Sequence, residues 1–457
     1  MAELLSLGLD VGTTTTQLIL SELTVENRAG AFSVPEMNIT ARRVRYQSPV
    51  HFTPMLDENR VDAAALRQLV AGEYEAAGIS RQQVDTGAII ITGETSRKEN
   101  ARKVLHSLSD FAGEFVVATA GPHLESLLAA KGAGSLELSR DGPLLHMDIG
   151  GGTSNLALLQ DGRVLRTGCL NVGGRLLKFD PQGMVTYVSP VLQGLTQLKP
   201  GDVATQSQAM KVAERLTQAL EMAAGLRPAD SLLERLSTAE AGAPFAPAPP
   251  GTAVCFSGGV AECIRQDYPW LQFGDLGPLL GRCIRDSRFR AHYVLGQETI
   301  RATVIGAGCH STQLSGSTVF CRGVPLPLKN LPVVCFSAAE QESPELSQLI
   351  EERCAKQDQT PVLSFPGVSG GYERICRLAN AISRVGCDPL YVAVERDMAK
   401  ALGQALSLRC PDRGILCLDG LQLQEGSYLD VGQPVGPAFP VVIKTLILAE
   451  SNKRYEM

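Results

Sequence analysis

The stretch MDIGGGTSNLALL, residues 147–159, decides the fold of this chain. An apolar run reaches Asp148, three glycines occupy positions 150–152, and Thr-Ser-Asn leads into a second apolar run. A fixed glycine loses more conformational freedom than any other residue, so three in succession indicate a backbone that must approach something closely. The pattern predicts a β-hairpin with a glycine-rich tip.

A second copy of this pattern, LDVGTTTTQLIL, lies at residues 9–20. The aligned pairs are Asp10 with Asp148, Gly12 with Gly150, Thr15 with Thr153, and Gln17 with Asn155. Each copy reads as a strand, an Asp-x-Gly turn and a second strand. Because internal repeats in sequence usually reflect repeated structure, the two hairpins predict two domains of similar build that face a shared site.

The chemistry of such hairpin tips suits a phosphate. Backbone N–H groups in a tight glycine-rich turn converge on one point, and threonine and serine hydroxyls add donors. An aspartate beside them could hold a divalent cation through water or orient an attacking water. A single hairpin could equally be a turn whose Asp satisfies backbone amides, but two matched copies favour phosphate binding.

The predicted site residues therefore come from both hairpins. The predicted phosphate-binding residues are Gly12, Thr13, Thr14 and Thr15 in the first hairpin and Gly150, Gly151, Gly152 and Thr153 in the second. Asp10 and Asp148 are the predicted catalytic residues, and the same two would hold Mg²⁺ through water.

Composition and charge exclude several function classes. The chain has 457 residues, 44% of them hydrophobic and 20% charged, which is an ordinary globular balance and enough for two or three domains. A net charge of −6 without any Lys/Arg block argues against a nucleic-acid partner. The longest apolar runs are strand-sized, and the N-terminus lacks a basic segment and a cleavage site, so we expect a cytoplasmic protein without a membrane span.

The sequence lacks the motifs of several other common cofactor and nucleotide sites. The 12 cysteines include no C-x-x-C pair, so we expect them to be buried small hydrophobic residues in a reducing compartment. No Gly-Lys dipeptide occurs, which excludes a Walker P-loop, and no G-x-G-x-x-G opens a helix after the first strand. No histidine has an aspartate two positions before it, so the D-x-H-x-x-G pattern of base-off cobalamin binders is also absent.

Strand and helix patterns alternate along the chain, which predicts α/β architecture. Helical patterns cover residues 62–78, 97–108 and 207–225, whereas the Pro/Ala-rich segment 241–251 predicts a loop or linker. The C-terminal third alternates in the same way, with four apolar strand candidates between helix candidates.

These motifs, in this order, resemble the actin-like ATPase superfamily, which includes actin, sugar kinases and chaperone ATPase domains. Besides the two hairpins, the matching stretches are ATAGPHLESLLAAKGAGS (118–135) and IRATVIGAG (300–308) for the connecting helices, VCFSGGVAECI (254–264) for the adenosine motif, and NVGGRLL (171–177) for a Gly-Gly element. The resemblance implies ATP as ligand, with Gly173, Gly174, Ser257, Gly258 and Gly259 as further nucleotide-binding residues. It also implies that the two connecting helices cross at a hinge between two lobes.

The implied fold is α/β, an actin-like (ribonuclease H-like) two-lobed ATPase with an additional α/β C-terminal region. We predict residues 1–140 as the first lobe, 141–300 as the second lobe, and 301–457 as a helix returning to the first lobe plus a family-specific region. Chaperone ATPases carry a water-positioning acid in the first connecting motif. The comparable Glu125 is predicted to be a helix surface charge instead, which would make hydrolysis slow.

A narrower resemblance, to ethanolamine ammonia-lyase reactivating factors, runs from end to end of the chain. It rests on ITGETSRKENA (91–101), ATVIGAGCHSTQLSG (302–316), FPGVSGGYERICRLANAI (365–382), VERDMAKALGQAL (394–406) and SYLDVGQPVGPAFPVVIKTLIL (427–448). The resemblance implies a chaperone that uses ATP and Mg²⁺ to release damaged cobalamin from the lyase holoenzyme, so that intact adenosylcobalamin rebinds. It leaves a homo-oligomer and an association with an ethanolamine-utilization microcompartment open.

Three other functions remain open at this point. A small-molecule kinase of the same superfamily would need a catalytic carboxylate over a substrate hydroxyl, and the sequence singles out none. A filament-forming or scaffold actin homologue would assemble with nucleotide. An activator of a radical dehydratase would hold an iron–sulfur cluster, for which Cys169, Cys255 and the other cysteines lack a shared arrangement.

Overall fold

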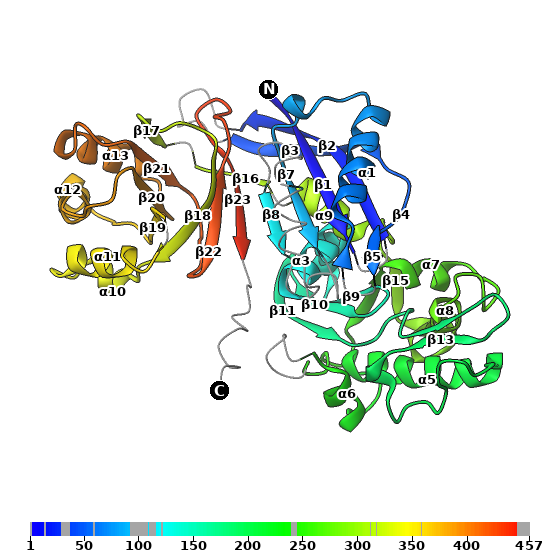
Figure 1. Cartoon of the computed structure of the whole chain (residues 1–457). Helices are drawn as coiled ribbons and strands as arrows, with labels where there is room; N and C mark the ends of the chain where they lie inside the picture. Colours follow the sequence, from blue (N-terminus) through cyan, green and yellow to red (C-terminus); the bar gives the residue numbers. More distant parts are fainter. Residues whose placement is uncertain are drawn as a thin grey trace, which may run out of the picture.

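The computed structural model describes residues 2–12, 15–28, 37–57, 60–91, 108, 116–119, 122–238, 245–310, 312–316, 318–357 and 359–445. The predicted site residues Thr13 and Thr14, and all but the last residue of the predicted helix 97–108, lie outside these ranges. The chain forms three bodies, each built around its own sheet (Figure 1).

The first sheet carries the first hairpin. Its strands are β1 (Ala2–Val11), β2 (Thr15–Asn27), β3 (Met37–Gln47), β7 (Thr86–Ile91) and β8 (Val116–Thr119), in the order β3-β2-β1-β7-β8, with β4 (His51–Phe52) beside β2. β1, β2 and β3 are antiparallel, whereas β7 and β8 continue parallel to β1. Helix α1 (Ala63–Ala76), whose N-terminus is capped by Asp62, shares a buried apolar core with the sheet. The short strands β5 (Met55–Asp57) and β6 (Arg60–Val61) precede α1.

The second sheet repeats this arrangement. Its strands are β9 (Leu144–Ile149), β10 (Ser154–Gln160), β11 (Arg163–Leu170), β14 (Ala253–Ser257) and β15 (Tyr293–Leu295), in the order β11-β10-β9-β14-β15. The pairing directions match those of the first sheet strand for strand. The largest apolar core of the chain lies here, between the sheet and its helices. The further elements are β12 (Leu177–Phe179), β13 (Val185–Val188), α5 (Gln206–Ala223), α6 (Ser231–Leu236), α7 (Gly259–Arg265) and α8 (Gly277–Asp286).

Two helices connect the repeated bodies. Helix α3 (Pro122–Gly132) follows the first sheet but packs on the second, and α9 (Ala302–His310) follows the second sheet but packs on the first. They cross at contacts so close that a Cβ at Gly132 would lie 1.8 Å from the Ala302 carbonyl oxygen. A Cβ at Gly306 would lie 2.0 Å from the Leu128 carbonyl oxygen. Only glycine fits at either position, because neither backbone oxygen can move aside.

The two connecting helices cross as the sequence predicted, and the fold is the actin-like, ribonuclease H-like fold. Two sheets of the same strand order, each opening with a glycine-tipped hairpin, are joined by the crossed pair of helices (Figure 1). The short helix α4 (Ser135–Leu138) joins α3 to the second sheet.

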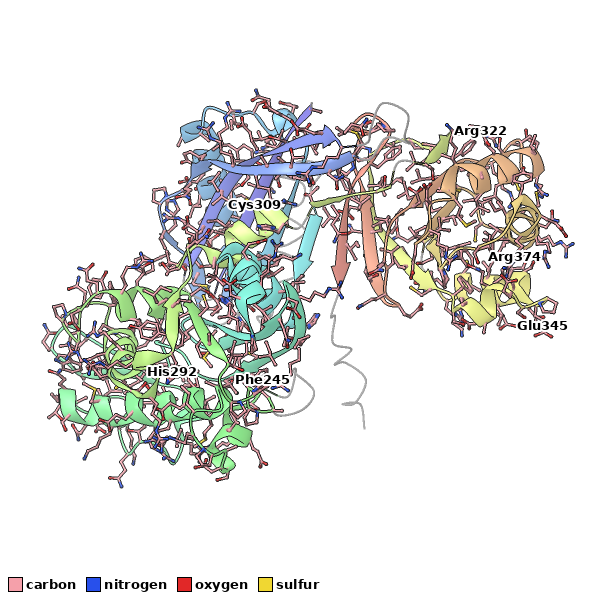
Figure 2. The ribbon with its side chains drawn as sticks, turned by 180° about the vertical axis from the view of Figure 1, so that it is seen from behind. Phe245, His292, Cys309, Arg322, Glu345 and Arg374 are labelled. Carbon is pink, nitrogen blue, oxygen red and sulfur yellow. The ribbon has the colours of Figure 1, made fainter. Side chains whose placement is uncertain are left out.

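The C-terminal body is a third sheet of eight strands, in the order β16-β23-β22-β18-β19-β20-β21-β17. The strands are β16 (Thr312–Leu314), β17 (Phe320–Arg322), β18 (Leu328–Cys335), β19 (Val362–Phe365), β20 (Leu390–Val394), β21 (Ile415–Asp419), β22 (Ser427–Val431) and β23 (Pro440–Thr445). Strands β18 to β21 are parallel, and the helices α10 (Ala338–Gln341), α11 (Leu346–Cys354), α12 (Tyr372–Ser383) and α13 (Ala399–Arg409) connect them in turn. This body carries Arg322, Glu345 and Arg374, well away from Phe245 of the second lobe (Figure 2).

The predicted elements of the C-terminal third are all present. The two lobes also match the predicted patterns at the helices over 62–78 and 207–225, and residues 245–251 have no regular structure. In the part of the chain that the structure describes, every helix is too short or too polar to span a lipid bilayer.

Candidate functional site

The two hairpin turns have the same backbone geometry. The Gly12 N–H donates to the Thr15 carbonyl oxygen over 2.9 Å, and the Gly150 N–H donates to the Thr153 carbonyl oxygen over 2.9 Å. In the strand pairs, Asp10 lies opposite Gln17, just as Asp148 lies opposite Asn155. The internal repeat is therefore a repeat of structure, down to the hydrogen bond that closes each turn.

Asp148 lies at the end of β9, where its side chain is 7% exposed. Its Oδ1 accepts a hydrogen bond from the Ser257 hydroxyl, and its Oδ2 lies 3.4 Å from the Thr303 hydroxyl. Burial raises the pKa of this carboxyl, while the two hydroxyl donors act in the opposite direction. Strand β14 supplies Ser257 and helix α9 supplies Thr303, so both lobes contribute to holding this carboxylate.

Behind Asp148 stands a buried chain of hydrogen bonds. The Ser257 Oγ lies 3.1 Å from His146 Nε2, and His146 Nδ1 lies 2.8 Å from the Ser135 Oγ. Burial lowers the pKa of His146 to about 3, so its ring is neutral at pH 7. Because Ser257 gives its one proton to Asp148, the ring must donate from Nε2 and accept at Nδ1 from Ser135. Every donor in the chain thus points toward Asp148.

The Gly-Gly element at 171–177 supports the second hairpin. The Gly174 N–H donates to the Gly150 carbonyl oxygen over 3.0 Å, and the Arg175 N–H donates to the Gly151 carbonyl oxygen over 2.6 Å. A Cβ at Gly173 would lie 2.3 Å from the Gly151 oxygen, so only glycine fits. The structure brings the predicted Gly173 and Gly174 against the turn, where the N–H groups of Gly174 and Arg175 occupy two of its carbonyl oxygens.

The predicted adenosine motif follows β14 directly. Gly258 has a φ of +87°, and a Cβ there would lie 2.4 Å from the Ile149 carbonyl oxygen, so the strand-to-helix turn itself requires this glycine. Gly259, the first residue of α7, has open space where a Cβ would stand, and the same holds for Gly152 in the second hairpin. Protein packing therefore does not require glycine at these two positions.

The first hairpin is supported by different residues. The Thr53 hydroxyl donates to the Gly12 carbonyl oxygen over 2.7 Å and lies 3.1 Å from the Thr16 hydroxyl. The Gln17 side-chain amide donates to the Ile300 carbonyl oxygen over 3.2 Å, which ties this hairpin to the segment before α9. Asp10 is half-buried at the end of β1.

Sequence reasoning missed the supporting residues His146, Thr303 and Thr53. Thr303 falls within the predicted connecting-helix motif but was not singled out there, and Thr53 falls in no motif. His146 lies two residues before Asp148 on the same face of β9, which is a signal that could have identified it. Two predictions were wrong. Glu125 is buried rather than a surface charge, because α3 is covered by both the second sheet and α9.

The cysteines were the second error. Only six of them are buried; five, among them Cys283 in α8 and Cys335 at the end of β18, are partly exposed, and Cys321 on the edge strand β17 is exposed. All twelve carry free thiols. Within the described residues, no three His, Cys, Asp or Glu side chains gather in a way that could hold a metal ion. A cation at the hairpins would therefore depend on water and phosphate oxygens as well as on aspartate.

Comparison with known proteins assigns the chain to a family. The family model described as "Ethanolamine utilisation protein EutA" matches residues 2–449. The "Ethanolamine ammonia-lyase reactivase EutA" of Salmonella typhimurium is 39% identical over 97% of this chain and 98% of its own length, and that of Escherichia coli is 38% identical over the same shares. Among solved structures, the Aquifex aeolicus Ppx/GppA family member is 12% identical, with a TM-score of 0.38 over 67% of this chain and 97% of its own. The chain belongs to the ethanolamine utilisation protein EutA family.

Proposed function

We propose that this chain is an ATP-dependent reactivating chaperone for adenosylcobalamin-dependent ethanolamine ammonia-lyase. It would drive the release of damaged cobalamin from the holoenzyme, after which intact adenosylcobalamin rebinds. The observation that carries the nucleotide part is the pair of matched hairpins with Asp10 and Asp148 at corresponding positions. The lyase part is supported by the curated relatives, whose names make them reactivases of that enzyme.

In this proposal the phosphates lie between the two hairpin tips. The phosphate contacts are Gly12, Thr13, Thr14 and Thr15 on one side and Gly150, Gly151, Gly152 and Thr153 on the other, with Gly173 and Gly174 as support and Ser257, Gly258 and Gly259 at the adenosine. The open space above Gly152 and Gly259 fits a ligand that rests on backbone N–H groups. When bound, Mg²⁺ would neutralise phosphate charge, and Asp10 and Asp148 would hold it through water.

Asp148 suits this task because of how it is held. Its Oδ1 is occupied by Ser257, whereas its Oδ2 has only the long Thr303 contact of 3.4 Å and can accept from water. The neutral His146 behind Ser257 adds no positive charge that would compete with a cation. Slow ATP hydrolysis is expected unless Asp10, Asp148 or the buried Glu125 orients the attacking water.

The crossed helices supply a route from nucleotide to partner. Thr303 in the first turn of α9 touches Asp148, and the carbonyl of Cys309 in its last turn accepts a hydrogen bond of 2.7 Å from Arg42 of β3. A shift at the Asp148 end is therefore transmitted along a short, rigid helix into the first lobe. The glycine contacts hold α3 and α9 in close packing at their crossing, and in this proposal nucleotide state biases the angle between the lobes through this crossing.

The test uses lyase holoenzyme inactivated with cyanocobalamin. The full chain, ATP, Mg²⁺ and free adenosylcobalamin are added, and ammonia release from ethanolamine is measured. Activity should return only when ATP is present, and an Asp148→Ala variant should lose this recovery. Asp141→Ala, at an exposed aspartate of the same lobe, is the matched control and should behave as the unaltered chain. No recovery, or equal recovery without ATP, would overturn the proposal.

The same samples separate the rival functions. ATP turnover stimulated by a sugar or polyol but not by the lyase would make the chain a kinase, and nucleotide-dependent light scattering would make it a filament former. The proposal places the chain in the cytoplasm with the lyase holoenzyme and ATP as partners, and without nucleic acid or membrane. Co-fractionation with an ethanolamine-utilization microcompartment, and the mass of the chain in solution, would settle its location and whether it forms a homo-oligomer.

A further inference from the structure

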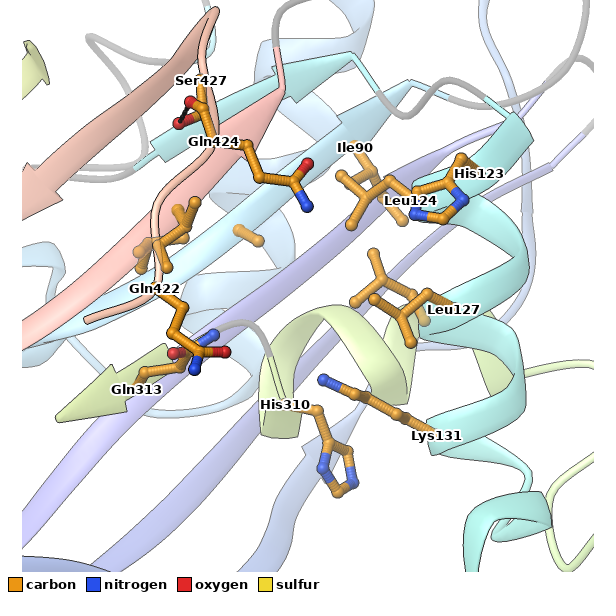
Figure 3. Close-up of a pocket in the computed structure, with 14 residues that line it drawn as sticks. Ile90, His123, Leu124, Leu127, Lys131, His310, Gln313, Gln422, Gln424 and Ser427 are labelled. Atoms are coloured by element: carbon orange, nitrogen blue, oxygen red, sulfur yellow. Dashed lines mark hydrogen bonds between the residues drawn. The ribbon is translucent and has the colours of Figure 1, made fainter. Parts of the chain in front are cut away.

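A cavity of about 260 Å³ lies away from the hairpins, where three parts of the molecule meet (Figure 3). Helix α3 forms one wall, strand β7 and the end of α9 form the floor, and the C-terminal body closes the other side with β16, β23 and the segment before β22. Pockets for drug-sized ligands usually run from about 300 to 1,000 Å³, so this one suits a smaller molecule.

The cationic side of the cavity lacks a counter-charge. Lys131, in the last turn of α3, and His310, the last residue of α9, both line it, and Arg42 stands close to both. In the described ranges, no ion pair joins any of these three to a carboxylate. Arg42 donates its Nε–H to the Cys309 carbonyl oxygen and is not among the described residues that line the cavity, which leaves Lys131 as the charged group that a ligand would meet.

The surroundings of Lys131 disfavour its charge. Burial, followed by the nearby Arg42, lowers the pKa of Lys131, and burial together with Arg42 and Lys131 lowers the pKa of His310 to about 4. A partly desolvated ammonium with a cationic neighbour is unfavourable unless an anion compensates it. An anion that entered the cavity would offset the repulsion between Lys131 and Arg42. Its attraction to the Lys131 ammonium would hold it in the cavity.

The remaining walls define the rest of the ligand. Figure 3 shows the Lys131 amine extending from α3 toward the side where Gln313 and Gln422 lie. Gln424 adds a third primary amide, and such groups both donate and accept hydrogen bonds. The apolar part of the lining comes from α3, β7 and β23. It is made by Ala88, Ile90, Leu124, Leu127, Val442 and Ile443.

We propose that this cavity binds a small organic anion, either a carboxylate or a phosphate monoester. The charged group of the ligand would lie at Lys131, and its polar atoms would hydrogen-bond with Gln313 and Gln422. Its short apolar part would pack against Leu124 and Leu127. Such a ligand would touch the connecting helix α3 and the C-terminal body at once. It would therefore fix the position of the C-terminal body relative to the hinge. This inference is independent of nucleotide binding and of the lyase.

The experiment is calorimetric titration of the full chain, without nucleotide, with n-butyl phosphate, with butyrate and with 1-butanol. One of the two anions should bind, and the neutral alcohol should bind at least about tenfold more weakly because it lacks the charge-assisted contact. The anion that binds more tightly shows whether the natural ligand carries a phosphate or a carboxylate group. Absence of binding by both anions, or equal binding of the alcohol, would overturn the proposal.

Variants locate the site. Lys131→Met keeps most of the apolar stem and should weaken anion binding about tenfold or more, whereas Lys131→Arg should retain it. Gln422→Leu changes an exposed residue at the other wall, cannot plausibly unfold the chain, and should weaken binding of the same anion. Lys199→Met, at an exposed lysine of the second lobe, is the matched control and should bind as the unaltered chain. Unchanged affinity in both Lys131→Met and Gln422→Leu would remove the site from this cavity.

Discussion

The two hairpins share a backbone but differ in what surrounds their aspartates. In the second, Asp148 is buried and receives a directed chain of donors through Ser257 from His146. In the first, Asp10 is half-buried, and the main support acts on the turn itself, through Thr53 on the Gly12 carbonyl. The second hairpin therefore holds its carboxylate in one buried, hydrogen-bonded position. The first is tied by Gln17 to the segment before α9, whereas the second contacts α9 itself through Thr303.

The largest test of this difference compares Asp148→Asn with Asp10→Asn. Both remove a charge that the proposed function assigns to Mg²⁺, but Asp148 acts in a more desolvated position, where charge interactions are stronger. We expect Asp148→Asn to lower ATP-dependent recovery of the lyase by about a hundredfold, and Asp10→Asn by clearly less. Ammonia release after cyanocobalamin inactivation measures both. Equal losses in the two variants would mean that the hairpins are equivalent in function as well as in backbone.

A second test compares a glycine that supports the second hairpin, Gly173, with a glycine that is proposed to contact the nucleotide, Gly152. Gly173→Ala places a methyl group 2.3 Å from the Gly151 carbonyl oxygen and should lower the free energy of unfolding by about 3 kcal/mol. Gly152→Ala meets open space and should change stability by less than about 0.5 kcal/mol.

The two variants should differ in which property they lose. Gly173→Ala should lose more stability, whereas Gly152→Ala should lose more affinity for ATP. A methyl group at Gly152 stands where the phosphates are proposed to lie, so ATP affinity should fall although the fold is intact. Urea unfolding and calorimetric titration with ATP measure the two properties separately. If Gly152→Ala binds ATP as tightly as the unaltered chain, then the open space above that glycine does not belong to the nucleotide.

A third test compares the hydrogen bonds that support each hairpin. Ser257→Ala removes the donor to the Asp148 carboxylate and leaves His146 Nε2 without its acceptor, which should cost about 1.5–3 kcal/mol. Thr53→Val keeps the shape but removes the donor to the Gly12 carbonyl, and should cost about 1 kcal/mol. Urea midpoints at fixed pH give both values. A larger loss in Thr53→Val would show that the first hairpin is the more firmly held of the two.

Much of this comparison was accessible from the sequence, because it depends on local pattern. Asp-x-Gly between two apolar runs specifies a hairpin wherever it occurs, and the repeat specified two of them. Gly132 and Gly306 fell within stretches of small residues, which is the signature that close helix crossing leaves. The alternating C-terminal third likewise predicted parallel strands with helices between them.

What the sequence could not supply are contacts between distant segments. Asp148 is held by residues 109 and 155 positions away, and no local pattern pairs a histidine on β9 with a serine on β14. Glu125 was misjudged for the same reason, since its burial follows from α9, which lies far along the chain. The pairing of β22 with β18 in the eight-stranded sheet is also a contact between distant segments. It depends on which strand edges the neighbouring strands leave without a partner.

The smallest expected effect concerns the far end of α9, opposite its contact with Asp148. Burial, Arg42 and Lys131 lower the pKa of His310 to about 4, below the 6.5 of an unperturbed histidine. Between these two values the unfolded chain binds a proton at this residue and the folded chain does not, so stability rises with pH across this window and falls on acidification. His310→Gln should make the dependence of the urea midpoint on pH between about 4 and 6.5 shallower, and the slope that remains is expected from the buried His146, whose pKa is about 3. The same variant should leave that dependence unchanged above pH 7, where the His310 ring is neutral in both states. A slope between pH 4 and 6.5 that is as steep as in the unaltered chain would show that the end of α9 does not contribute to the acid sensitivity.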